Sequence, residues 1–134
     1  MKHVKNLKIV ITAGASGIGS EIAMILSQAD AKVIICDKDQ EVLDQFSKNN
    51  PEIITLKADV SREEEVASFF NEIKDHFGEI NALINNAGIA GPSAKLEDTN
   101  FNDWKNTLSV NLNGTFLSTK SAIPLLRSAG GGSI

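Results

Sequence analysis

The residues best suited to chemistry lie in a glycine-rich stretch near the amino terminus, Gly14-Ala15-Ser16-Gly17-Ile18-Gly19. An apolar run precedes it and an amphipathic run follows it, so it joins a predicted strand to a predicted helix. Glycine lets the backbone approach a ligand closely, and the N–H groups and dipole at a helix start attract an anion. The stretch therefore predicts a pyrophosphate cradle that opens a βαβ unit; the alternative is an ordinary tight turn.

A carboxylate lies at a suitable distance to complement this turn. Asp37 ends the next predicted strand, 20 residues beyond Gly17. An acidic residue at about that distance accepts hydrogen bonds from an adenosine ribose and repels a 2′-phosphate. The alternative is a strand-end aspartate in a turn. Lys38 could bind a 2′-phosphate, but Asp37, in the position that binds the ribose hydroxyls, repels that phosphate. The pattern therefore favours NAD over NADP.

Alternating strands and helices must position these residues, and the hydrophobic pattern predicts them along the whole chain. It predicts an α/β fold of three layers, with a Rossmann-type parallel sheet in strand order 3-2-1-4 and right-handed crossovers. The first two helices are expected on opposite faces, or separated by the switch point. Strands are predicted over 8–12, 32–37, 53–58 and 80–85, helices over 17–29, 39–48, 61–77 and 100–126, and the start of a fifth strand at 133–134.

Local patterns add detail to three helices. Ser61 and Glu64 have the spacing of a capping box, and Gly78 is typical of a helix C-cap. In the first helix, helical spacing predicts one buried face made of Ile18, Ile22, Ile25, Leu26 and Ala29. In the long last helix it predicts inward positions for Phe101, Trp104, Leu108, Leu112 and Phe116.

Composition narrows the classes of protein. With 134 residues, 42% of them hydrophobic, the chain is expected to form a single domain over 1–134. A net charge of −4 lacks the basic footprint of a nucleic-acid binder. Cys36 is the only cysteine, so disulfide and metal frameworks are not expected, and Cys36 itself is interpreted as a small buried hydrophobe. Neither a signal peptide nor a membrane span is apparent, which makes a cytoplasmic setting the expectation.

Four motifs, in order and spacing, resemble the classical short-chain dehydrogenase/reductase family. The stretch from Thr12 to Gly19 resembles its TGxxxGIG turn, and Ala58-Asp59-Val60-Ser61 its adenine-binding segment. Asn85-Asn86-Ala87-Gly88 matches its NNAG motif, and 110–116, VNLNGTF, the pattern around its active-site asparagine. The resemblance covers nearly the whole chain. It implies the cofactor-binding half of an NAD-dependent oxidoreductase that transfers hydride between nicotinamide and an alcohol or carbonyl substrate.

The resemblance also implies a role for each matching residue. Asn111 would be the asparagine of an Asn-Ser-Tyr-Lys tetrad, at a helix kink whose freed carbonyl holds a water; the alternative is an exposed or locally bonded asparagine. Asn85 would help to hold the fourth strand. Asp37 would select NAD, Asp59 and Val60 would face the adenine, and Asn86, Ala87 and Gly88 the ribose side. The turn backbone at Gly14, Ser16, Gly17, Ile18 and Gly19 would carry the pyrophosphate and adenosine ribose.

The sequence departs from the family pattern in two places. Ala13 stands where the family has its first glycine, which adds strain of about 1 kcal/mol if that position needs a positive φ, unless Gly14 makes the turn instead. The chain also contains no tyrosine, whereas the family's YxxxK pair and catalytic serine follow the fifth strand. Ser133 comes too early to be that serine. The chain is therefore expected to be truncated and inactive alone; the alternative is a non-catalytic nucleotide-binding or self-associating module.

The same pattern predicts self-association. The fourth strand would be left as a sheet edge, and an unpaired edge invites pairing with another chain. Apolar residues of the long helix, including Leu117 and Ile123, exceed what a four-stranded half-domain could cover. A homo-oligomer is expected, held either through this helix alone or through this helix and the fourth strand together.

Overall fold

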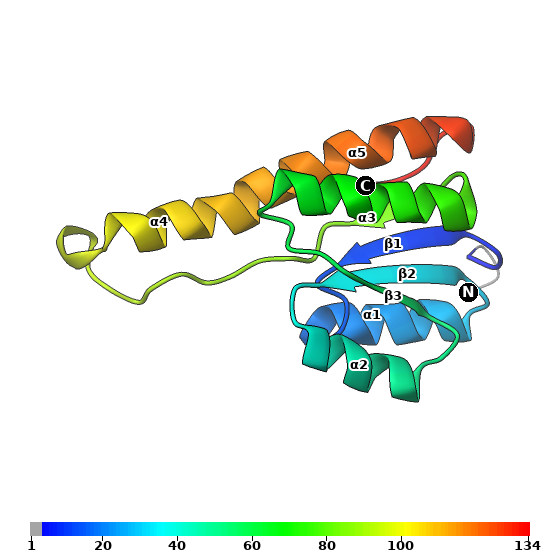
Figure 1. Ribbon diagram of the computed structural model, residues 1–134, viewed down its shortest axis with the longest axis horizontal. Helices are drawn as coiled ribbons and strands as arrows, with labels where there is room; N and C mark the ends of the chain where they lie inside the picture. Colours follow the sequence, from blue (N-terminus) through cyan, green and yellow to red (C-terminus); the bar gives the residue numbers. More distant parts are fainter. Residues whose placement is uncertain (1–3) are drawn as a thin grey trace.

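The computed structural model describes residues 4–134, and its centre is a four-stranded parallel sheet in the order β3-β2-β1-β4 (Figure 1). The sheet confirms the predicted fold class and strand order. The bounds of β1, Lys8–Thr12, and β2, Lys32–Asp37, are those predicted. β3 at Ile54–Lys57 and β4 at Ala82–Ile84 are shorter than expected. Val10 of β1 lies between Ile34 and Leu83 in the register.

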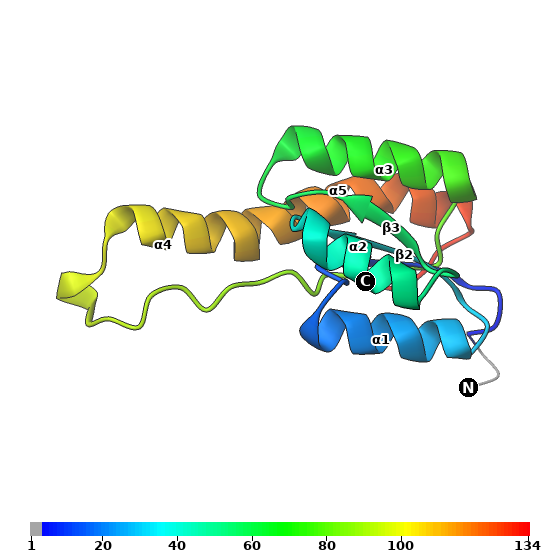
Figure 2. The same ribbon diagram turned by 60° about the horizontal axis from the view of Figure 1, so that its bottom comes forward.

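The helices cover both faces of this sheet. α1 (Gly17–Gln28) and α2 (Gln40–Asn49) lie on one face, and α3 (Glu63–Phe77) and α5 (Gly114–Ser128) on the other (Figures 1 and 2). The expectation that the first two helices are on opposite faces, or separated by the switch point, was wrong. Two right-handed crossovers that move in one direction, from β1 to β2 to β3, place their helices on the same face. The chain then reverses direction to reach β4, and α3 lies on the other face.

Two apolar clusters hold the layers together, one on each side of the sheet. Val10 and Ile34 point to the side of α3 and α5, where they meet Phe69 and Ile73. Ile11 and Ile35, among the alternate residues, point to the side of α1 and α2. Because the central strands are buried on both faces, they carry continuous apolar runs.

The buried face of α1 differs from the predicted one. Ile18 is 76% exposed and Ile25 is also exposed, whereas Gly19 and Ala23 are buried. Ile22 and Leu26 do pack against the core. The helix thus presents the small residues Gly19 and Ala23 to the sheet near its start, which lets its backbone lie close to β1. Ile18, next to Gly19, is therefore turned to the solvent.

The start of α3 also differs from the prediction. The helix begins at Glu63 with Arg62 as N-cap, so Ser61 is not the cap of an S-x-x-E box. The Ser61 hydroxyl instead donates to Asp59 Oδ1 at 2.7 Å. The predicted end is confirmed, because Gly78 follows the helix with φ of +72°.

The long last helix is three segments in one rod. α4 (Phe101–Leu108) continues through a π-helical turn, Ser109–Asn113, into α5, and a short 3₁₀ turn, Leu96–Asp98, precedes it. α4 and the extended segment before it project from the body of the molecule (Figures 1 and 2). The prediction that this helix buries Phe101, Trp104, Leu108, Leu112 and Phe116 was wrong, because all five are exposed. Of these segments only α5 lies over the sheet, so α4 has no sheet to pack on, and Phe116 lies on an exposed side of α5.

The last residues of the chain lie beside β4. Ser133 forms a parallel bridge with Ala82. Leu83 N donates to Ser133 O at 3.0 Å, and Ser133 N to Asn81 O at 3.1 Å. These bonds confirm the predicted beginning of a fifth strand at this edge.

Candidate functional site

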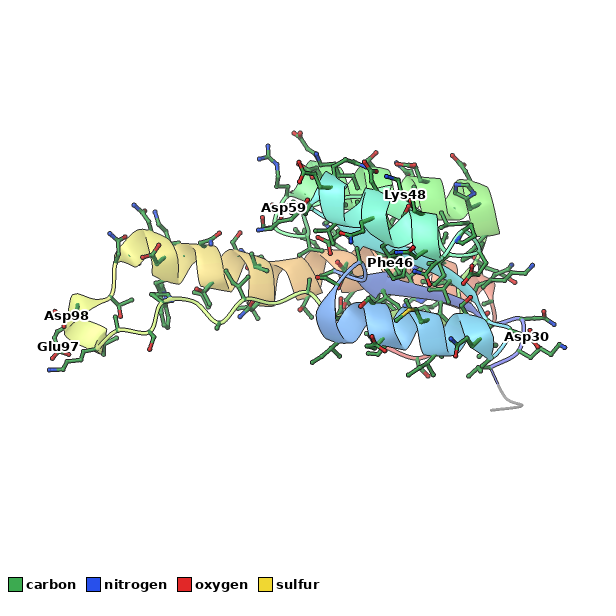
Figure 3. The ribbon with its side chains drawn as sticks, turned by 90° about the horizontal axis from the view of Figure 1, so that it is seen from below. Asp30, Phe46, Lys48, Asp59, Glu97 and Asp98 are labelled. Carbon is green, nitrogen blue, oxygen red and sulfur yellow. The ribbon has the colours of Figure 1, made fainter. Side chains whose placement is uncertain are left out.

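The candidate site lies at the carboxyl edge of the sheet, toward which the strand arrows of Figure 1 point. Figure 3 shows Asp59 at this end of the body, where α4 projects, and Asp30 at the opposite end. A pocket of about 90 Å³ opens here. It brings together five residues predicted to bind cofactor: Asp37, Asp59, Val60, Ala87 and Gly88. Its other lining residues are Ala13, Lys38, Ala58, Ile89 and Val110.

The turn between β1 and α1 presents free backbone donors next to this pocket. Ser16 is the N-cap of α1, its side chain makes no capping hydrogen bond within residues 4–134, and the first turn has no acidic residue. By contrast, Asp39 caps α2, accepting from Glu41 N at 3.0 Å, and Asn100 caps α4. The first amides of α1 are therefore available to an anion.

Three positions of the turn show why it is rich in glycine. A Cβ on Gly19 would overlap the Ala13 carbonyl oxygen and the Asn86 amide, and one on Gly14 would come within 2.7 Å of Ile35. Gly17 has φ of +55°. Ala13 has φ of +50°. The positive φ thus falls on Ala13, and the alternative that Gly14 makes the turn was wrong.

Thr12 and Asn86 fasten the turn to the segment after β4. Thr12 Oγ1 accepts hydrogen bonds from Asn86 N and Ala87 N, both at 3.0 Å. The Asn86 side-chain amide donates to Thr12 O at 3.1 Å and to Ala13 O at 2.9 Å. Asn86 therefore positions the turn, while its contact with a ribose stays a prediction. Thr12 was missed by sequence reasoning, although a hydroxyl at the end of an apolar strand was the available signal.

Two hydrogen-bonded turns shape the side of the pocket predicted to hold the adenosine, one after β3 and one after β2. Asp59 Oδ1 accepts from Ser61 N at 2.9 Å, which closes a turn after β3. Asp59 N donates to Glu65 Oε2, and Glu65 Oε1 pairs with Arg62 Nε, each at 2.9 Å. At the end of β2, Asp37 Oδ1 accepts from Asp39 N at 3.3 Å. Glu65 was missed because it acts through the backbone of Asp59, six residues away in sequence.

Asn111 lies in the π-helical turn and ties down the segment after β4. Its Nδ2 donates to Ile89 O at 2.9 Å, and its Oδ1 accepts from Ile89 N at 2.8 Å. The Asn111 carbonyl accepts from Thr115 Oγ1 at 2.8 Å. Asn111 is thus exposed, as the alternative interpretation had it, yet bonded to a distant segment; its role toward a water stays a prediction.

Asn85 and Gly114 support the site from α5. Asn85 Nδ2 donates to Thr119 Oγ1 at 3.1 Å, which links the end of β4 to α5. A Cβ on Gly114 would come within 2.8 Å of Val60 Cγ2, so α5 lies directly against the predicted adenine segment. Gly114 was not singled out from the sequence, since its contact with Val60 spans distant parts of the chain.

The remaining chemistry-bearing groups are inert or scattered. Cys36 is buried in β2, and burial raises the pKa of its thiol from 9.0 to about 12. Within residues 4–134, His, Cys, Asp and Glu form no group of three able to hold a metal ion. Over the same residues, none of the helices has the length and apolarity needed to cross a bilayer.

A doubly wound parallel sheet, a phosphate-type turn after β1 and an acidic residue at the end of β2 define the class of dinucleotide-binding α/β domains. The profile of the short chain dehydrogenase family matches residues 7–134, and the chain belongs to that family.

Relatives and solved structures agree with this assignment. The chain is 35% identical to "L-fucose dehydrogenase" of Bos taurus, over 92% of this chain and 46% of that protein. It is 38% identical to "Uncharacterized oxidoreductase YxbG" of Bacillus subtilis, over 98% of this chain and 50% of that protein. The structure superposes on gox2181 with a TM-score of 0.91 and 26% identity, covering 97% of this chain and 53% of the other. It superposes on levodione reductase with a TM-score of 0.88 and 30% identity, covering 96% of this chain and 52% of the other. The chain spans about half the length of these proteins.

Proposed function

We propose that residues 1–134 form the dinucleotide-binding domain of an NAD-dependent oxidoreductase, which transfers hydride between nicotinamide and an alcohol or carbonyl substrate. The observation that carries the proposal is the convergence of the open α1 amides, Asp37 and Asp59 on one edge of the sheet. Family membership supports it, as do relatives whose names describe dehydrogenases and reductases.

The residues present fit such a cofactor. There is no room for a Cβ at Gly19, so the turn presents only backbone atoms at this position. The uncapped start of α1 offers N–H donors to a pyrophosphate. Asp37 supplies acceptors for ribose hydroxyls, while Asp59 and Val60 wall the pocket where an adenine would lie. When bound, the cofactor supplies the hydride-carrying nicotinamide ring.

The rest of the chain positions these groups. Thr12 and Asn86 fix the cradle, and Glu65 fixes Asp59. In the proposed reaction, Asn111 would be the tetrad asparagine and its carbonyl would help to hold a water of the proton relay. The chain contains no tyrosine, so the proposed acid–base pair is not supplied by these residues.

Calorimetric titration with NAD and NADP tests the proposal. NAD should bind more tightly, because the Asp37 carboxylate repels a 2′-phosphate. Asp37→Ala should narrow the gap between the two dissociation constants by about tenfold, which corresponds to about 1.4 kcal/mol. The matched control is Asp75→Ala, which removes the same charge from an exposed position of α3. It should leave the difference between the two dissociation constants unchanged. Tighter binding of NADP by the unaltered chain would contradict the proposal.

A second candidate is a non-catalytic nucleotide-binding or self-associating module. The exposed apolar residues of α4 and α5 favour self-association. In either case we expect no steady oxidation of NADH by the purified, mass-verified chain with carbonyl substrates, because the Tyr/Lys pair is missing. Reading the encoding gene beyond codon 134 separates the two: an open frame with YxxxK supports the oxidoreductase, and a stop codon supports the module.

We also propose that the chain forms a homo-oligomer through an apolar strip on the α4–α5 rod. The strip consists of Phe101, Trp104, Leu108, Leu112, Phe116 and Ile123, all exposed. A contiguous exposed apolar patch of this kind is typical of an interface.

The single buried thiol of Cys36 fits the proposed cytoplasmic setting, where thiols stay reduced.

A further inference from the structure

Ala13 holds a backbone conformation that suits glycine better than alanine. Its φ of +50° lies in the left-handed region, where a Cβ approaches the following carbonyl oxygen. A glycine would adopt this conformation without that contact. The methyl group of Ala13 is therefore carried at a cost to the stability of the fold.

The neighbours of Ala13 hold the turn in place despite this strain. The Ala13 carbonyl accepts from Asn86 Nδ2 at 2.9 Å, and Gly14 N donates to Cys36 O at 2.9 Å. Thr12, just before it, is bonded to the backbone of Asn86 and Ala87. Hydrogen bonds from the β2 side and from the β4 side thus determine the conformation of the turn, which is how strained residues persist at binding sites.

The position of Ala13 relative to the pocket suggests what the methyl group does. Among turn residues 12–19, Ala13 alone lines the pocket of about 90 Å³. Asp37, the acceptor assigned to the ribose hydroxyls, lines the same pocket. A sugar bound at Asp37 would therefore share this small pocket with Ala13, and a group added to that sugar would need space in the same pocket.

We propose that Ala13 is a steric specificity determinant, which together with Asp37 excludes a 2′-phosphate from the adenosine ribose. This inference rests on the proposed function, since it assumes that the pocket takes an adenosine. The two residues exclude the phosphate by different physical means. Asp37 repels it by charge, which salt screens, and Ala13 excludes it by volume, which salt does not change.

Two small probes, adenosine 5′-monophosphate and adenosine 2′,5′-bisphosphate, isolate this part of the site. The measured quantity is the ratio of their dissociation constants for the 134-residue chain, at low and at high salt. Ala13→Gly should reduce the preference for the monophosphate by about tenfold at both salt concentrations, because a single carbon in a pocket discriminates on that scale. Asp37→Ala should reduce it at low salt and much less at high salt. Ala13→Gly should also raise the thermal midpoint, because the strain is removed.

The matched control is Ala15→Gly, which makes the same chemical change in the same turn but outside the pocket lining. It should leave the ratio unchanged. A ratio for Ala13→Gly within twofold of the original, or a change that disappears at high salt, would overturn the inference and leave the proposed function standing. A chain that binds neither NAD nor either probe would overturn both.

Discussion

Cys36 illustrates, at the scale of one residue, how burial sets chemistry. The side chain is fully buried in β2, and burial raises the pKa of the thiol from 9.0 to about 12. A charged thiolate in this position would lose its hydration without gaining an ion pair. The thiol is therefore neutral in the folded protein at all physiological pH values, and it should resist alkylation until the protein unfolds.

The raised pKa predicts a loss of stability in alkali. Above pH 9 the thiol of the unfolded chain loses its proton, while the folded protein keeps it up to about pH 12. The unfolded state then binds fewer protons, so the free energy of unfolding falls as pH rises. The slope from this group reaches about 1.4 kcal/mol per pH unit once the unfolded thiol is fully ionised. Urea unfolding at pH 8, 9 and 10 measures the fall.

Other groups titrate in the same range, so the comparison must be made with Cys36→Ala. This variant is less stable throughout because of the smaller side chain, but it lacks the thiol. The stability difference between the two proteins should shrink by about 1 kcal/mol between pH 9 and 10, because the unfolded thiol is half ionised at pH 9 and almost fully ionised at pH 10. If the stability difference between the two proteins does not change with pH, the thiol ionises equally well in the folded and the unfolded state.

At the scale of elements, α5 is the helix that connects the sheet to the projecting α4. Its buried face includes Ser118, which is 1% exposed and whose hydroxyl has no hydrogen-bond partner within residues 4–134. A buried polar group without a partner costs free energy, because its hydrogen bonds to water are lost and not replaced.

Ser118→Ala should therefore stabilise the protein by about 1 kcal/mol, since it removes the unpaired hydroxyl and alanine is also the better helix former. Urea unfolding with circular dichroism provides the measurement. Ser128→Ala is the matched control in the same helix, because that hydroxyl is exposed and donates to Pro124 O at 3.1 Å. If Ser118→Ala instead lowers the stability, the hydroxyl has a partner in solution.

At the scale of the whole molecule, the apolar strip is what the body of the domain leaves uncovered. Phe101 is 69% exposed, Leu112 63% and Phe116 61%. Lys105 lies over the Phe101 ring and Lys120 over the Phe116 ring, at 5.1 and 5.9 Å from the ring centroids. These cations cover little of an apolar surface that runs along both α4 and α5.

Sedimentation velocity at micromolar concentration should show a homo-oligomer, because burying the strip removes this apolar area from water. Phe116→Asp should shift the distribution toward monomer by placing a charge in the middle of the contact. Ile25→Asp, on an exposed site of α1, is the control and should not shift it. A monomer for the unaltered chain would contradict the proposed interface.

The sequence by itself determined the strand order and most element bounds. Continuous apolar runs such as β1 and β2 are typical of strands buried on both faces, and a glycine such as Gly78 is typical of a helix end because glycine accepts a positive φ. Asp37 was predicted from its distance to the glycine-rich turn, whereas Asp59 and Gly88 were predicted from the resemblance to the short-chain dehydrogenase/reductase family. All three line the pocket, because the carboxyl ends of parallel strands meet at one edge.

Only the tertiary structure decided which helix faces are buried and how the site is held. Helical spacing predicts that Ile18 and Phe116 face the core, but whether they are covered depends on what lies beside them, and in the structure both are exposed. The bonds from Thr12 to Asn86 and from Asn111 to Ile89 join segments distant in sequence, so no local pattern specifies them. The conformation of Ala13 likewise depends on hydrogen bonds with β2 and with the segment after β4, which form only once the sheet has formed.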